Sequence, residues 1–237
     1  MSAPVEADAR RLLSIPRLQS ERGLVHGFST LALGSMRDEA SRRRLSAALG
    51  LEWEEVTVAG AVHGAEIATV QGAVPRMDDV DGLVTAVPGR GLFVSLGDCY
   101  PLIAYDRRRR ALGLAHAGWR GTAAGIAGEL VARLTAEYGC DPADLLVGIG
   151  PGICGRCYEV GDDVARRFPA NAVRPGTGDG KFLLDLVAAN RAALVEAGVR
   201  PENVHAAGIC TYETAALPSH RRDGDGRRFA CLAALRR

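Results

Sequence analysis

Apolar residues along the chain gather into short runs, and glycine, proline and aspartate separate most of these runs. Runs of about four to eight apolar residues between turn-forming residues are typical of β-strands. The pattern predicts strands at residues 23–30, 56–62, 66–70, 82–84, 92–96, 102–105, 111–115, 145–149, 204–209 and 229–235. We therefore expect a chain that is rich in β structure.

Helical periodicity is confined to fewer segments. The predicted helices span residues 37–49, 122–138, 163–168 and 185–197, and residues 170–180 are predicted to be a loop. The clearest helix carries apolar residues on one face, with Thr122 as its expected N-cap and Gly139 just past its end. Asp185 is the expected N-cap of the last helix.

The order of these elements predicts the fold class. No internal repeat and no linker divides the pattern, so residues 21–237 are expected to form a single catalytic domain, with residues 1–20 as a peripheral lead-in. Strict strand–helix alternation is missing, which argues against a plain Rossmann fold. We expect an α/β protein in the broad sense (α+β), in which mixed β-sheets are layered and flanked by helices.

Composition narrows the possible partners and location. The net charge is +1, which gives no electrostatic case for nucleic acid or an anionic membrane. No apolar run approaches the roughly 20 residues of a membrane helix, and no secretory signal is evident in the sequence. A chain of 237 residues with six cysteines needs no disulfides to fold, so a cytoplasmic protein with free thiols is expected.

Three residues on separate segments are the leading candidates for chemistry: His63, Cys99 and His116. Each is close to a glycine, and both histidines come at or near the end of an apolar run. Two imidazoles and a thiolate are sufficient to bind zinc with one position left open for chemistry. Separations of 36 and 17 residues (99 − 63 and 116 − 99) neither require nor exclude such a site, and hydrogen-bonded core histidines with a buried thiol remain the alternative.

Residues next to this set suggest a binding site for an anion. Arg120 precedes the predicted helix start at Thr122, and an arginine beside free backbone N–H groups suits a phosphate or a carboxylate. Asp98, next to Cys99, is a candidate proton carrier or a partner of the ligands. An ordinary surface ion pair is the alternative for Arg120.

Two further segments carry cysteines or dense polar residues. Cys154 and Cys157 form a Cys-x-x-Cys pair, which is compatible with redox chemistry or a structural zinc, although no second such pair occurs. The stretch with Cys210, Glu213 and the arginines after Ser219 could contact an anionic substrate or form surface ion pairs.

Several motifs together resemble the YfiH-like family, whose members are described as laccase-domain polyphenol oxidases, purine nucleoside phosphorylases and peptidoglycan-editing factors. The motifs are AHAGWRGT at 115–122, DCYP at 98–101, GPGICGRCYEVG at 150–161, CTYET at 210–214, SHRRDG at 219–224 and RRFA at 227–230. The resemblance implies that His63, Cys99 and His116 are metal ligands, and it implies a layered fold related to toxin deamidases. An arginine usual in the family after Phe28-Ser29-Thr30 is replaced here by Leu31.

The resemblance implies a zinc enzyme acting on purine nucleosides. The implied reactions are phosphorolysis of adenosine, inosine or methylthioadenosine and deamination of adenosine. From the residues themselves, we expect Arg120 and Thr122 to contact phosphate and substrate, and Asp98 and Arg120 to be the catalytic groups. The expected partners are a purine nucleoside and phosphate, and the expected state is a monomer or small homo-oligomer.

Three alternatives remain open at this stage. A Cys–His hydrolase or amidase would use Cys99 as nucleophile and His116 as base on a peptidoglycan precursor. A laccase-like polyphenol oxidase would bind copper in place of zinc at the same residues. A nucleotide-binding module would bind purines without turnover.

Overall fold

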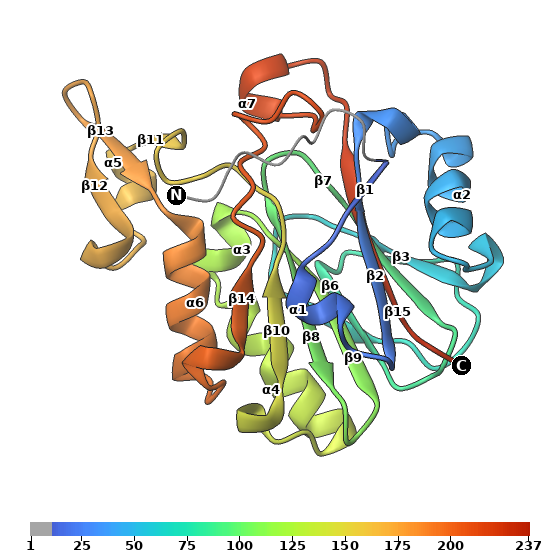
Figure 1. Ribbon diagram of the computed structural model, residues 1–237. Coiled ribbons are helices and arrows are strands. Elements are labelled where there is room, and N and C mark those ends of the chain that lie inside the picture. Colours follow the sequence, from blue (N-terminus) through green and yellow to red (C-terminus); the bar gives the residue numbers. More distant parts are fainter. Residues whose placement is uncertain (1–10) are drawn as a thin grey trace.

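The computed structural model describes residues 11–237 (Figure 1). Residues 1–10, which include half of the predicted lead-in, lie outside the described residues. Within the described part, residues 11–20 contribute a short strand and a short helix, and Ile15 and Leu18 are buried. None of the helices in residues 11–237 has the length and apolarity needed to cross a bilayer.

Two six-stranded mixed sheets form the centre of the molecule. The first has the order β1 (Leu12–Leu13), β2 (Leu24–Ser29), β15 (Phe229–Leu235), β7 (Gly91–Leu96), β3 (Val56–Gly60) and β5 (Arg76–Asp78). The second has the order β14 (Val204–Ala206), β10 (Leu146–Ile149), β8 (Tyr100–Asp106), β9 (Ala111–Ala117), β6 (Gly82–Thr85) and β4 (Ile67–Thr69). Both contain parallel and antiparallel pairs, as in β3 with β7 and β8 with β9.

Helices cover the outer faces of the two sheets, which gives four layers (Figure 1). The helices are α1 (Pro16–Gln19), α2 (Glu39–Ala48), α3 (Trp119–Ala123), α4 (Ile126–Tyr138), α5 (Asp162–Ala165), α6 (Leu186–Glu196) and α7 (His220–Asp223). Short 3-10 turns span Leu31–Leu33, Trp53–Glu55, Pro142–Asp144, Ala170–Ala172 and Pro201–Asn203. Helix α2 lies beside the first sheet, and α4 and α6 lie beside the second.

Strand β9 shows why the sequence folds into layers. All seven of its residues are buried, because one face packs between the sheets and the other packs against α4. Leu112 and Leu114 belong to the core between the sheets, whereas Ala111 and Ala115 face the helix core. A strand buried on both faces reads as a continuous apolar run, which is why the sequence predicted it. The expected fold class of layered mixed sheets with flanking helices is confirmed.

The predicted helix at 122–138 is wrong at its start. The chain forms α3 from Trp119 and then α4 from Ile126, and Gly125 between them takes a left-handed φ of 88°. Glycine adopts this conformation without the steric strain of a Cβ atom. Thr122 therefore lies inside α3 and caps neither helix, whereas Gly139 does end α4 in the left-handed conformation. Asp185 caps α6 as predicted, accepting a hydrogen bond from the Ala188 amide.

A small third sheet was missed. It consists of β11 (Glu159–Gly161), β13 (Lys181–Leu184) and β12 (Val173–Pro175). The predicted loop at 170–180 is wrong where β12 forms, and the predicted helix at 163–168 is the shorter α5. These strands are short and mostly half-buried or exposed, so they lack the apolar runs that identify core strands.

Candidate active site and metal centre

Cys99 and His116 are brought together by the register of two neighbouring strands. In the antiparallel pair of β8 and β9, Tyr100 lies opposite Ala117 and Pro101 lies opposite His116. Cys99 comes one residue before β8 and is therefore next to the end of β9. Asp98 takes a positive φ of 79°, which allows a sharp turn between β7 and β8.

His63 joins these residues from the loop after β3, and a buried carboxylate fixes that loop. Asp81 accepts hydrogen bonds from the backbone amides of Val62, His63 and Gly64 at 3.1, 2.9 and 2.7 Å. Asp81 Oδ1 also lies 2.9 Å from His116 Nδ1. Because one carboxylate contacts both histidine segments, Asp81 sets their relative position and leaves Nε2 of His116 free for other contacts.

The donor atoms of His63, Cys99 and His116 all lie within 4.8 Å of one another. The two imidazole rings are 4.9 Å apart between centroids. His116 is buried, Cys99 is half-buried and His63 is exposed, so the cluster is open on one side. Two imidazoles and one thiolate with an accessible fourth position match the donor chemistry of a catalytic zinc site.

Cys99 and His116 shift each other's protonation. Burial raises the pKa of Cys99, but the charge and hydrogen bonds of the two imidazoles, His116 above all, lower it to about 6. Burial lowers the pKa of His116, but the Cys99 thiolate and the Asp81 carboxylate raise it to about 9. In the metal-free pair these shifts favour a thiolate beside an imidazolium, and an ion bound at the same ring nitrogen would replace its proton.

The cluster forms part of a cleft with a volume of about 620 Å³. The lining is strongly basic, with guanidinium groups from Arg42, Arg76, Arg120, Arg221 and Arg228. The Arg120 guanidinium stacks on the Trp119 ring at 4.3 Å from its centroid. A cleft lined by arginines attracts an anionic group such as phosphate.

Of the other three predicted site residues, two line the cleft and one does not. Arg120 and Asp98 line the cleft. The Asp98 carboxylate is occupied by the protein itself, accepting from Thr211 Oγ1 at 2.6 Å and from the Arg221 amide at 2.7 Å. Thr122 lies outside the set of lining residues, and its hydroxyl accepts a hydrogen bond from Asn190 Nδ2 at 3.1 Å.

Asp81 and Tyr158 are parts of the site that sequence reasoning missed. Asp81 lies before strand β6 and is fully buried, which is rare for a carboxylate unless it is paired, as Asp81 is with His116. Metal-binding histidines usually donate their second ring N–H to a carboxylate, so a search for such a partner could have found it. Tyr158 lines the cleft beneath the Arg221 guanidinium.

The family model described as multi-copper polyphenol oxidoreductase laccase matches residues 35–236. The chain belongs to this family. The laccase-domain chain is 39% identical to a purine nucleoside phosphorylase of Deinococcus radiodurans, over 83% of this chain and 77% of that protein. It is 31% identical to adenosine deaminase RL5 from an unknown prokaryotic organism, over 80% of this chain and 79% of that protein.

Solved structures agree with the family assignment. The YlmD protein of Geobacillus stearothermophilus superposes with a TM-score of 0.85 at 33% identity, covering 97% of both chains. The Bacillus licheniformis protein YfiH superposes with a TM-score of 0.88 at 27% identity, covering 98% of both chains. The resemblance to the YfiH-like family that the motifs suggested is thereby confirmed for this laccase-domain chain.

Proposed function

We propose that this chain is a zinc-dependent purine nucleoside enzyme. It would cleave adenosine, inosine and methylthioadenosine with phosphate, and it would also deaminate adenosine. The convergence of His63, Cys99 and His116 at an arginine-lined cleft carries the proposal, because these residues match a zinc site with an open position. The names of the relatives, purine nucleoside phosphorylase and adenosine deaminase, support the same substrate class.

In this proposal, Arg120 binds the phosphate. Its guanidinium offers paired donors to a phosphate, and its stacking on Trp119 restricts the orientation of those donors. Phosphorolysis breaks the glycosidic bond while positive charge develops on the ribose. The purine leaves with the bonding electrons and takes up a proton, and a phosphate held beside the ribose carbon forms the new bond to it. Arg221 and Arg228, which line the same cleft, add to the positive charge that retains the phosphate.

The two aspartates position groups in this scheme. Asp81 holds His116 Nδ1, so that Nε2 and the Cys99 thiolate can both bind the ion. Asp98 keeps Thr211 and the Arg221 amide at the wall of the cleft through its two carboxylate oxygens. His63, Cys99 and His116 would hold the zinc ion, which would supply Lewis acidity at that wall when bound. We assign Asp98 a positioning role, because both of its oxygens already accept hydrogen bonds.

The proposal includes a reducing cytoplasmic setting and a monomer or small homo-oligomer. The six cysteines are all free thiols, and a thiolate ligand has to stay reduced to bind the ion. Copper is the alternative ion for the same donors, and the family description names copper oxidation. Zinc is preferred because the three ligands at the cleft suffice for a single ion there, whereas multi-copper oxidation of phenols needs several copper ions close together.

A Cys–His hydrolase acting on a peptidoglycan precursor is the second candidate. Cys99 contacts His116, and His116 contacts Asp81, which is the arrangement of a nucleophile, a base and an orienting carboxylate. His63 discriminates the two candidates. His63→Ala should remove zinc and activity together from a metal enzyme, whereas a cysteine nucleophile would retain activity in that variant.

The decisive experiment measures metal content and product on the same sample. The protein is purified without a polyhistidine tag and assayed on adenosine and inosine with and without phosphate. Phosphate-dependent release of the base supports phosphorolysis, and release of ammonia without phosphate supports deamination. Saturable purine binding without turnover in zinc-loaded protein would contradict the proposal and favour a binding module.

A second assay tests the phosphate contact. Arg120→Ala should raise the KM for phosphate about tenfold or more while zinc content stays unchanged. Arg133→Ala, in α4, is the matched control, because Arg133 is half-buried outside the cleft and forms ion pairs with Glu66 and Glu137. An unchanged KM for phosphate in Arg120→Ala would remove this residue from the mechanism.

A further inference from the structure

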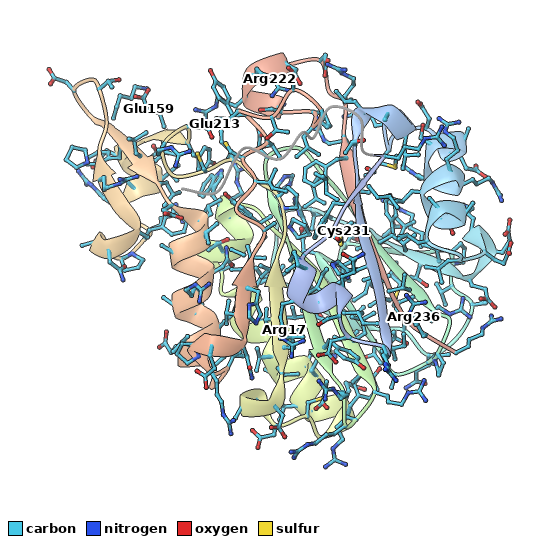
Figure 2. The ribbon with its side chains drawn as sticks, viewed as in Figure 1. Arg17, Glu159, Glu213, Arg222, Cys231 and Arg236 are labelled. Atoms are coloured by element: carbon cyan, nitrogen blue, oxygen red, sulfur yellow. The ribbon has the colours of Figure 1, made fainter. Side chains whose placement is uncertain are left out.

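A second cluster of metal-binding side chains lies at the end of the molecule near α7. It consists of Cys154, Cys157, Cys210 and Glu213, and their donor atoms all lie within 4.8 Å of one another. Figure 2 labels Glu213 between Glu159 of β11 and Arg222 of α7 in this view. None of these four residues belongs to the set that lines the cleft. The proposed nucleoside reaction therefore leaves this cluster without a role.

The four residues come from two loops that the backbone already joins. Cys154 and Cys157 follow β10, whereas Cys210 and Glu213 follow β14. Gly152 forms a parallel bridge with Cys210, its amide donates to Ile209, and the Thr211 amide donates back to Gly152 at 3.1 Å. A Cβ atom on Gly152 would lie 2.6 Å from the Tyr100 ring, so only glycine fits this crossing. The two loops are therefore held together without any metal.

The spacing of the four donors suits a tetrahedral ion. Each loop supplies two ligands separated by three positions, and Cys-x-x-Cys is a common half of a zinc site. Zinc–sulfur bonds of about 2.3 Å place tetrahedral sulfurs about 3.8 Å apart, so the cluster needs to contract by less than about 1 Å. Glu213 Oε1 already lies 3.8 Å from Cys154 Sγ and 3.3 Å from Cys157 Sγ.

Neighbouring groups stabilise the negative charge of such a site. The Cys154 amide donates to Cys210 Sγ at 3.3 Å. Arg156 contacts both carboxylate oxygens of Glu213 at 3.1 and 2.9 Å, which offsets part of the charge of three thiolates and a carboxylate. Glu213 lies at the surface, so an ion has a path into the cluster.

We infer that Cys154, Cys157, Cys210 and Glu213 form a second, closed zinc site that fastens the loop after β10 to the loop after β14. Four protein ligands leave no open position, so the site is structural. Its neighbours reach the cleft, because Ile153 lines it and Thr211 holds Asp98 at 2.6 Å. The second ion therefore stabilises one wall of the cleft.

The test counts metal ions in the whole chain, so it does not depend on the proposed reaction. Tag-free protein is loaded with zinc under reducing conditions, dialysed, and weighed by native mass spectrometry with elemental analysis. We expect two zinc equivalents in the natural chain and one in each of Cys157→Ser and His63→Ala. Cys231→Ala, in the buried interior of β15, should keep both equivalents. One equivalent in the natural chain, lost in His63→Ala, would overturn the inference.

Two measurements keep the inference testable if Cys157→Ser does not fold. Zinc should protect Cys154, Cys157 and Cys210 of the natural chain against alkylation, and peptide mapping reads this directly. Cobalt-loaded His63→Ala should keep a strong near-ultraviolet thiolate-to-cobalt absorption, because the three thiolates of the second site, Cys154, Cys157 and Cys210, are unchanged in this variant. A disulfide between Cys154 and either partner in the zinc-loaded, reduced protein, or rapid labelling of all three thiols, would contradict a second zinc site.

Discussion

The two thiol-containing clusters of this chain differ in how they are built. The cleft cluster takes His63, Cys99 and His116 from three separate segments, is positioned by the carboxylate of Asp81, and opens into a cleft. The second cluster, here called the rim cluster because its neighbours Ile153 and Thr211 reach the cleft, takes Cys154, Cys157, Cys210 and Glu213 from two loops joined by backbone hydrogen bonds. Three ligands with an accessible side suit catalysis, whereas four mutually close ligands suit structure.

This difference predicts which changes affect chemistry and which affect only the framework. An open site depends on the placement of each donor, because substrate and ion share it. A closed site depends mainly on the number of thiolates, because its task is to hold two loops together. The following changes test that division.

Removal of one thiol from each cluster should have the largest effect. Cys99→Ser should lower kcat/KM for nucleoside phosphorolysis about 1000-fold or more, because it removes a ligand at the reacting centre. Cys210→Ser should lower kcat/KM about tenfold or less, through the neighbouring contact of Thr211 with Asp98. Steady-state kinetics measures kcat/KM of both variants, and elemental analysis measures their zinc content. Comparable losses in the two variants would mean that the clusters act as one site.

The second change removes the carboxylate that joins the two histidine segments. Asp81→Asn should weaken zinc binding at the cleft about 10- to 100-fold, because an amide cannot accept three backbone N–H groups and also orient His116. Competition with a chromogenic chelator measures the affinity. Asp106→Asn is the matched control, since Asp106 is also buried and accepts hydrogen bonds from the backbone amides of Arg108 and Arg109. Equal zinc affinity in Asp81→Asn and the natural chain would contradict the role of Asp81.

Sequence reasoning selected His63, Cys99 and His116 as candidate ligands because they lie near glycines or at the ends of apolar runs and because the family motifs include two of them. It missed Asp81 because the partner of that carboxylate lies 35 residues further along the chain. The rim cluster was only half visible, since Cys154 and Cys210 are 56 residues apart and only the Cys-x-x-Cys pair has a recognisable spacing. The third sheet was missed because strands such as β12 are polar and exposed.

The third test compares thiol reactivity in metal-free, reduced protein. The imidazole of His116 lowers the pKa of Cys99 to about 6 against the opposing effect of burial, whereas burial and neighbouring hydrogen bonds raise the pKa of Cys157 far above its ordinary value. Thiolate is the reactive form, so its fraction grows as pH rises through the pKa. At about pH 7, Cys99 should therefore react with iodoacetamide at least about tenfold faster than Cys157. The ratio of rates is smaller than the ratio of thiolate fractions, because low-pKa thiolates are weaker nucleophiles.

The pH dependence distinguishes the two thiols further. The labelling rate of Cys99 should level off above about pH 7, whereas that of Cys157 should still rise at about pH 9. Mass spectrometry of the two peptides after short labelling times measures both rates. Parallel pH profiles would show that His116 does not lower the pKa of Cys99.

The smallest expected effect comes from one methyl group. Gly118 has an extended backbone that alanine also adopts, but a Cβ atom there would lie 2.8 Å from Cys99 Sγ and 3.4 Å from His63 Cδ2. Gly118→Ala should displace the thiol and lower zinc affinity and kcat/KM by about tenfold or less. Gly128→Ala, in α4, meets no atom within 4 Å and should instead stabilise the helix by about 0.5–1 kcal/mol. Thermal unfolding measures the stability of each variant, and zinc titration measures its zinc affinity. An unchanged zinc affinity in Gly118→Ala would show that Gly118 has a purely conformational role. The rim cluster should keep its zinc in both variants, since neither methyl group touches the loops after β10 and β14.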